Sequence, residues 1–171
     1  MTRTLAVAAD GRFSGYAALF GRVDQGGDVI QPGAFVRTLR KRDQSGVRML
    51  FQHDPGQPVG VWEELREDTR GLFVKGRLLT GVVAVADLAQ RINGGAVDGL
   101  SIGFRTSKAR RVGGVRRLLD VDLWEVSIVT FPMMEGARIA RAGLPPGADL
   151  STTLSAMTAL FSTPQKGNLS Q

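Results

Sequence analysis

The sequence predicts a single domain that is mainly β with flanking helices. Short segments of alternating apolar and polar residues, rich in β-branched and aromatic side chains, recur along the chain between glycines and prolines. The length of 171 residues, with 43% hydrophobic and 22% charged residues, is typical of one soluble globular domain with a buried core. A second catalytic domain does not fit in this length.

Six strands are expected from the alternation. They cover residues 13–20, 47–52, 59–64, 72–79, 100–106 and 118–130. We expect the last segment to break into two strands. Gly113 and Gly114 separate two short basic segments, and glycine readily adopts the positive φ that a two-residue hairpin loop requires. The sequence therefore predicts a basic ribbon that projects from the domain here.

Two helices are expected between the strands, over residues 33–42 and 82–92. Pro32 precedes the first, in which Phe35 and Leu39 are four residues apart, the spacing of neighbours on one helix face. Asn93-Gly94-Gly95 follows the second helix, and these residue types accept the left-handed conformation that closes a helix.

The composition shifts to Pro, Gly, Ser and Thr after Gly143. We expect a catalytic domain over residues 1–143 and a flexible or partner-docking tail over residues 144–171. An apolar stripe in this tail is more typical of a packing or partner surface than of a catalytic motif. It consists of Leu150, Leu154, Met157 and Phe161.

No membrane segment is expected. No stretch approaches the roughly 20 apolar residues that span a bilayer, and residues 1–10 lack the apolar core of a secretory signal. The sequence therefore predicts a protein that is made and used in the cytoplasm.

The formal net charge of +6 raises nucleic acid as a partner. The positive charge lies in short runs over residues 37–42 and 108–117, without the interleaved aromatic side chains on which bases would stack. We interpret these runs as solvated faces, and do not expect specific nucleic-acid binding.

The catalytic chemistry is narrowed by what the chain lacks. It has no cysteine, so a thiolate nucleophile and a Cys-based zinc site are excluded, and its single histidine excludes a His-rich metal site. The signatures of aspartic proteases and a Walker phosphate loop are also missing. We expect no metal and no cofactor, which leaves Ser or Thr nucleophile chemistry in which any imidazole base is His53.

Two residues are candidates for this chemistry. His53 lies between the strand over residues 47–52 and the turn sequence Asp54-Pro55-Gly56, where a side chain is held rigidly and still reaches a cleft. Alternation places Ser101 and Gly103 on one strand face, where the glycine leaves space beside the hydroxyl. The alternatives are a surface histidine in a turn and a small polar residue on a solvated face.

Glu125 is the third candidate, because it is the one carboxylate in the apolar segment over residues 123–132. A buried carboxylate needs a partner, and a hydrogen bond to an imidazole would give Glu125 the orienting role of a triad. Alternation equally permits Trp124 to face the core while Glu125 faces water.

Three segments carry the motifs of the site candidates: Phe51-Gln52-His53-Asp54-Pro55, Gly99-Leu100-Ser101-Ile102-Gly103-Phe104 and Trp124-Glu125-Val126-Ser127-Ile128-Val129-Thr130-Phe131-Pro132. Together, in this order, they resemble the HK97-type phage prohead protease family. Segments 27–35 and 71–76 support the similarity, which runs from about Gly15 to Ile139. Chains of this kind come from tailed phages, prophages and phage-derived gene transfer agents.

The resemblance implies a fold similar to the herpesviral assemblins, a closed, mainly antiparallel barrel with helices around it. It implies that Ser101 is the nucleophile and His53 the general base. In assemblins a second histidine orients the first. Glu125 aligns with this second histidine, so we prefer Glu125 to Asp122 or Asp120 as the third member of the triad.

The oxyanion hole of the assemblins is matched less well in this sequence, because the arginines that assemblins use just beyond the strand containing Glu125 are missing here. An oxyanion needs an oriented donor rather than a particular side chain. The backbone N–H of Met133 is therefore the candidate donor, with Arg138 as a weaker one.

The implied function is that of a serine endopeptidase inside the assembling prohead, in the bacterial host cytoplasm. Its implied substrates are the scaffolding segment of the major capsid protein precursor, other prohead proteins and the protease itself, and self-association is left open. The alternatives are a non-catalytic capsid-interior scaffold, a basic nucleic-acid-binding barrel and a serine esterase, although the Gly-x-Ser-x-Gly elbow of esterases is not met.

Overall fold

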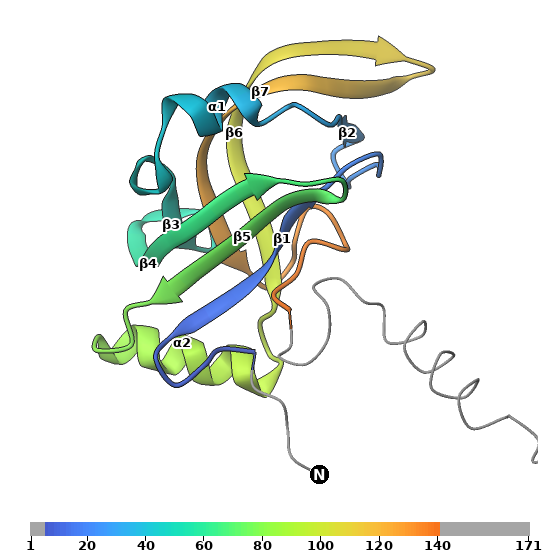
Figure 1. Ribbon diagram of the computed structural model, residues 1–171. Helices are drawn as coiled ribbons and strands as arrows, with labels where there is room; N and C mark the ends of the chain where they lie inside the picture. Colours follow the sequence, from blue (N-terminus) through green and yellow to red (C-terminus); the bar gives the residue numbers. More distant parts are fainter. Residues whose placement is uncertain (1–5, 141–171) are drawn as a thin grey trace, which may run out of the picture.

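The computed structural model describes residues 6–140, which form one seven-stranded sheet with two α-helices and a 3-10 turn (Figure 1). The predicted mainly-β class is confirmed. In chain order the elements are β1 (Arg12–Leu19), β2 (Asp28–Ile30), α1 (Val36–Lys41), the 3-10 turn (Gln44–Gly46), β3 (Arg48–Phe51), β4 (Asp54–Glu67), β5 (Gly71–Leu78), α2 (Val83–Gly94), β6 (Gly99–Val112) and β7 (Val115–Val129).

β7 is the central strand of the sheet. It pairs with β6 along one edge in antiparallel orientation and with β2 and β3 along the other in parallel orientation, and the sheet continues from β3 through β4 and β5 to β1. The predicted break within residues 118–130 is wrong, because β7 is one continuous strand. Register shifts between β6 and β7 let the long pair bend without a break.

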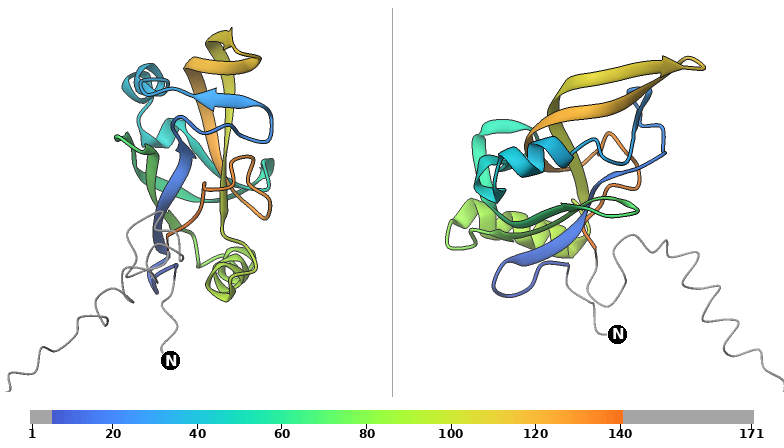
Figure 2. Two further views of the ribbon diagram at one scale, coloured as in Figure 1. Left: turned by 90° about the vertical axis from the view of Figure 1, so that its right-hand side faces the viewer. Right: turned by 45° about the horizontal axis from the view of Figure 1, so that its top comes forward.

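The sheet curls into a half-barrel, rather than closing completely as expected (Figures 1 and 2). The edge strands β1 and β6 do not pair with each other within the described residues. A short chain segment bridges them instead, through Gly15 to Ile139 on one side and Gly99 to Arg138 on the other. Glycine permits this approach, since a Cβ at Gly15 would lie 2.3 Å from the carbonyl oxygen of Arg138.

The core fills the concave side of the curled sheet, and α2 lies across one end of it. Val85, Leu88, Ala89 and Ile92 form the buried face of α2. The helix ends at Gly95, whose φ of 80° is the left-handed stop that was predicted. The first helix is shorter than expected: it covers only Val36–Lys41, and Gly33, where it was expected to begin, has a φ of 91°, outside the helical region.

The predicted basic hairpin is confirmed. β6 and β7 extend beyond the body of the domain as a two-stranded ribbon, seen at the top of Figure 1. Gly113 and Gly114 connect them with φ of 59° and 81°, the positive values of a tight hairpin loop. The predicted domain boundary after Gly143 and the tail over residues 144–171 lie outside the described residues. Among the described helices, none is long and apolar enough to cross a membrane.

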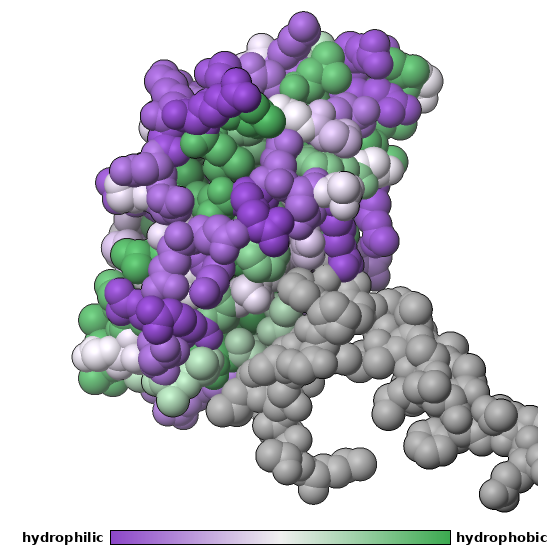
Figure 3. Space-filling view, viewed as in Figure 1, coloured by the Kyte–Doolittle hydropathy of each residue, from purple (hydrophilic) through white to green (hydrophobic). Residues whose placement is uncertain are grey.

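Apolar and polar side chains alternate over the face seen in Figure 3, where green patches lie between purple ones.

Within the core, β3, β4 and β5 meet around Gly76 on β5. A Cβ there would lie 2.4 Å from Cε of Met49 and 2.7 Å from the ring of Trp62. Both of these side chains are buried, so neither can move aside without disturbing the core.

We therefore expect Gly76→Ala to lower the free energy of unfolding by about 1–3 kcal/mol through overpacking. Urea unfolding measures the change. Gly81→Ala is the control, because a Cβ at Gly81 meets no atom within 4 Å. Equal stability of the two variants would contradict the packing around β5.

Candidate active site

Three adjacent strands bring the candidate residues together. β7 carries Glu125, β6 carries Ser101 on one side of it, and β3 ends on the other side, two residues before His53. In the register of β6 and β7, Ser101 pairs with Ser127 and Gly103 pairs with Glu125. Paired residues of an antiparallel ladder point to the same face, so these four positions share one face of the sheet.

His53 lies in a tight turn between β3 and β4. Gln52 and His53 form the two-residue loop, with φ of 55° and 59°, values that cost energy for residues other than glycine. The predicted turn sequence Asp54-Pro55-Gly56 instead lies within β4, where the ladder skips from Asp54 to Pro58. The carboxylate of Asp54 accepts a hydrogen bond from the backbone N–H of Gly56 at 2.8 Å.

Hydrogen bonds to β7 hold the strained turn. The backbone N–H of Gln52 donates to the carbonyl of Ile128 at 3.0 Å, and that of His53 donates to Oγ of Ser127 at 3.1 Å. The side chain of Gln52 also donates to Oγ1 of Thr130 at 2.7 Å. Backbone strain of this kind persists where the surroundings fix it, and it is common at functional sites.

The carboxylate of Glu125 contacts the imidazole directly. Oε1 lies 2.6 Å from Nδ1 of His53, and Oε2 accepts a hydrogen bond from Oγ of Ser127 at 2.6 Å. The side chain of Glu125 is 12% exposed. Gly103 makes room for it, because a Cβ at this position would lie 2.1 Å from Oε1.

The alternative arrangement, with Trp124 in the core and Glu125 in water, is wrong. Trp124 is 45% exposed and lies at a bulge, because Gly103 pairs with Glu125 while the next residue of β6, Phe104, pairs with Leu123. The bulge reverses the alternation at this point. It therefore lets Leu123 and Val126 both face the core while Glu125 turns to the opposite face.

Ser101 is 6% exposed and faces the same side as Glu125. Its neighbour Leu100 is completely buried on the opposite face. The hydroxyl of Ser101 makes no hydrogen bond to any other residue between 6 and 140. The structure thus brings His53 and Glu125 into contact and leaves Ser101 across β7 from His53, with no hydrogen bond between these two residues. Hydrogen bonds of catalytic groups are often loose without substrate and tighten when it binds.

The pKa of the His53 imidazole is raised above its ordinary value. The main cause is the hydrogen bond that the ring donates to Glu125, and partial burial of the ring acts in the opposite direction. The nearby carboxylate stabilises the imidazolium, and it also selects the neutral tautomer that carries its proton on Nδ1, leaving Nε2 as the basic nitrogen.

The other acidic candidates lie elsewhere. Asp122 pairs with Arg42 at 3.1 Å, and Asp120 pairs with Arg37 at 2.7 Å. Neither carboxylate contacts His53. The geometry therefore favours Glu125 over both as the partner of the imidazole.

The two oxyanion candidates lie in the segment after β7. Met133 is half exposed, and its carbonyl accepts a hydrogen bond from the backbone N–H of Gln25 at 3.0 Å. Pro132 lies against Gly99, two residues before Ser101, since a Cβ at Gly99 would be 2.8 Å from Cδ of the proline. The guanidinium of Arg138 pairs with Asp98, so its charge is already engaged.

Ser127 is the site residue that sequence reasoning missed. It is completely buried and links the carboxylate of Glu125 to the backbone of His53. Its position two residues after Glu125, on the same strand face, was the available signal. No group of three or more metal-binding side chains occurs in the part of the chain that the structure describes.

Comparisons with known proteins bear on the family and on the fold. A family model described as caudovirus prohead serine protease matches residues 2–145. The prohead protease of Enterobacteria phage HK97 is 39% identical over 135 residues, which cover 76% of this chain and 59% of that protein. The chain thus spans about three fifths of the length of this relative.

Three solved structures share the fold. The bacteriophage T4 capsid assembly protease matches with a TM-score of 0.58 at 15% identity, over 69% of this chain and 80% of that one. The protease of Kaposi's sarcoma herpesvirus with a hexapeptide phosphonate inhibitor matches with a TM-score of 0.56 at 13% identity, over 90% of this chain and 77% of that one. The varicella-zoster virus protease matches with a TM-score of 0.51 at 14% identity, over 90% of this chain and 77% of that one. At these identities the likeness shows the fold alone. The predicted similarity to herpesviral proteases is confirmed at this level.

The single histidine makes the His53–Glu125 contact directly measurable. We expect Glu125→Gln to lower the pKa of His53, because the variant loses the carboxylate that stabilises the imidazolium. NMR titration of the imidazole resonance measures the shift. Asp122→Asn is the matched control and leaves this pKa unchanged, since Asp122 pairs with Arg42.

The contact between His53 and Glu125 also makes the free energy of unfolding depend on pH. A raised folded-state pKa stabilises the fold below the unfolded-state pKa of histidine, and this contribution is lost as the pH rises through the folded-state value. This pH dependence of the free energy of unfolding should be weaker in Glu125→Gln. An identical titration of wild type and Glu125→Gln would contradict the contact.

Proposed function

The chain belongs to the caudovirus prohead serine protease family, and from this premise we propose that it is a serine endopeptidase of capsid maturation. The observation that carries the proposal is the 2.6 Å contact between His53 and Glu125, on the sheet face that also presents Ser101. A histidine with one nitrogen held by a carboxylate and the other free is the general base that a serine nucleophile requires.

The proposed reaction is acyl transfer. Nε2 of His53 takes the proton from Oγ of Ser101 as this oxygen attacks the peptide carbonyl, and the imidazolium then gives the proton to the leaving amine. Water, deprotonated by the same imidazole, hydrolyses the acyl-enzyme and releases Ser101. His53 thus serves as base and acid in each half of the reaction.

Glu125 and Ser127 prepare the imidazole for this role. Glu125 accepts the Nδ1 proton and stabilises the charge that develops on the ring. Ser127 holds the second carboxylate oxygen and the backbone N–H of His53 through one hydroxyl group. We assign Glu125 the orienting role of the triad and Ser127 a positioning role behind it.

The oxyanion of the tetrahedral intermediate needs a donor oriented toward the reacting carbonyl. We propose the backbone N–H of Met133 for this role, supported by the packing of the adjacent Pro132 against Gly99 near the start of β6. Arg138 is the weaker candidate, since its guanidinium is paired with Asp98.

The proposed substrates are the scaffolding segment of the major capsid protein precursor and the protease itself, within the assembling prohead in the host cytoplasm. The family to which the chain belongs supports this assignment. A non-catalytic scaffold protein would not require a carboxylate on the imidazole or a cleared space at Gly103. An esterase lacks support from the fold that the comparisons describe.

We expect Ser101→Ala and His53→Ala each to reduce cleavage of the capsid precursor by at least about 10³-fold, because each removes one partner of the nucleophile–base pair. Glu125→Gln should lose less activity, since the role of an orienting group is partly replaceable. Gel-based processing assays with purified precursor measure all three rates.

Thr69→Ala, a hydroxyl deletion at an exposed position between β4 and β5, is the control and should retain wild-type activity. Normal processing by a folded Ser101→Ala variant would reject the mechanism. If Asp122→Ala lost activity while Glu125→Gln kept the wild-type rate, the orienting role in the triad would belong to Asp122 instead.

Ser127→Ala should lower kcat by about 10- to 100-fold, less than the 10²–10⁴-fold contribution of a general base. The variant frees one oxygen of Glu125 and the N–H of the strained His53 turn. A shifted pH–rate profile together with a changed His53 resonance would identify the positioning role. A loss of thermal stability with unchanged kcat and pH profile would show that Ser127 is only structural.

A further inference from the structure

The positive charge of the chain is concentrated in the β6–β7 ribbon. Residues 99–119 contain six arginines and lysines and no carboxylate, so this segment alone accounts for the formal net charge of +6. The remaining residues contain equal numbers of positive and negative side chains. The excess charge is therefore a property of one exposed ribbon rather than of the whole surface.

Several cationic side chains of the ribbon have no acidic side chain as an ion-pair partner in the described residues. Arg110 lies directly opposite Arg117 in the ladder, an arrangement of like charges that destabilises a strand pair. Lys108 lies opposite Asp120, but this carboxylate pairs with Arg37 from α1. Lys108, Arg110 and Arg117 form no ion pair within residues 6–140.

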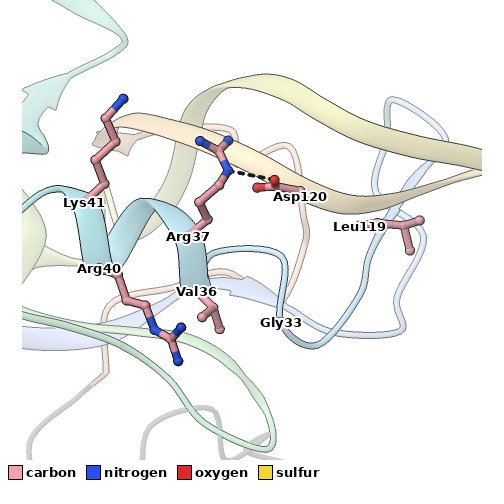
Figure 4. A pocket seen from close by; sticks show the side chains of 7 residues that line it. All are labelled: Gly33, Val36, Arg37, Arg40, Lys41, Leu119 and Asp120. Carbon is pink, nitrogen blue, oxygen red and sulfur yellow. Dashed lines mark hydrogen bonds and ion pairs between the residues drawn. The ribbon is translucent and has the colours of Figure 1, made fainter.

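The basic surface continues onto α1 at the base of the ribbon. A cavity of about 470 Å³ lies between this helix and β7 (Figure 4). Arg37 points across it to Asp120, and Val36 and Leu119 add apolar side chains to its lining. Arg40 and Lys41 also line the cavity and form no ion pair in the described structure. The cavity combines positive charge with apolar contacts, which suits the side chains of a polypeptide.

The backbone of the ribbon also favours a polypeptide partner. Beyond Phe104, β6 pairs only with β7, so its outer edge presents unpaired N–H and C=O groups over the exposed residues 105–112. An extended peptide adds to such an edge through main-chain hydrogen bonds. A nucleic acid does not use these groups in this way, and residues 105–117 contain no aromatic side chain for stacking bases.

We propose that the β6–β7 ribbon is a docking surface for an extended, acidic polypeptide segment. The proposal rests on the proposed function in one respect: the docked chain is the substrate. β6 also carries Ser101, so at about 3.3 Å per residue Arg105 lies roughly 13 Å and Arg110 roughly 30 Å from the nucleophile along the strand. Docking would thus select chains with acidic residues at these distances from the cleaved bond.

The test is binding of a fluorescein-labelled peptide of alternating glutamate and threonine, about 12 residues long to match the ribbon, measured by anisotropy in the Ser101→Ala background. We expect salt-sensitive binding that falls at least tenfold in the triple variant Lys108→Gln, Arg110→Gln, Arg117→Gln. The triple variant should remain folded, because it removes the like-charge pair of Arg110 and Arg117.

The matched control is the triple variant Arg22→Gln, Lys75→Gln, Arg91→Gln. It removes the same charge at exposed positions outside the ribbon and should bind as the parent does. The corresponding peptide of glutamine and threonine should bind at least tenfold more weakly. Equal binding of the neutral peptide, or equal loss in both triple variants, would overturn the proposal, as would tighter binding of a duplex DNA with the same number of charges.

A separate assay distinguishes this proposal from the proposed function. With Ser101 present, the ribbon variant should cleave a short uncharged peptide at the wild-type rate and lose cleavage of acidic substrates. Acidic-peptide binding by a protein that cleaves nothing would reject the peptidase and retain the docking surface. Cleavage without any acidic-peptide binding would reject the docking surface alone.

Discussion

The register between β6 and β7 is the constraint on which the site depends. It sets Ser101 opposite Ser127 and Gly103 opposite Glu125, so that the proposed nucleophile Ser101, the carboxylate of Glu125 and the hydroxyl of Ser127 face one side of the sheet. Leu100 and Ile128 are completely buried on the other side. A slip by one residue would exchange these faces, at the cost of exposing the core, so burial of the apolar face also maintains the site.

Much of this arrangement follows from sequence patterns. Alternation predicts the common face of Ser101 and Gly103, and the paired glycines at 113 and 114 predict the ribbon. The third candidate could not be decided in this way, because alternation permitted either Trp124 or Glu125 to face the core. A bulge at Trp124 breaks the strict period, and its position depends on pairing with β6 rather than on β7 itself.

Other features depend on contacts that no local pattern reports. The turn at Gln52 and His53 adopts positive φ without glycine, since Ser127, Ile128 and Thr130 supply its hydrogen bonds from a distant strand. The three-residue strand β2 is too short for a periodic signal. The segment that bridges β1 and β6 is likewise recognised only through the close backbone approach at Gly15 and Gly99.

One long hairpin thus carries the proposed site residues Ser101 and Glu125 as well as the charged ribbon. Its inner half contributes the proposed nucleophile and the carboxylate partner of the base, while its outer half carries the excess charge of the chain. The proposed mechanism requires that His53 activates Ser101. It is tested most directly by mass spectrometry of the protein after reaction with a serine-directed fluorophosphonate. We expect one adduct, on Ser101, that is lost in folded His53→Ala. An adduct on Ser127 instead, or labelling of Ser101 that does not depend on His53, would contradict it.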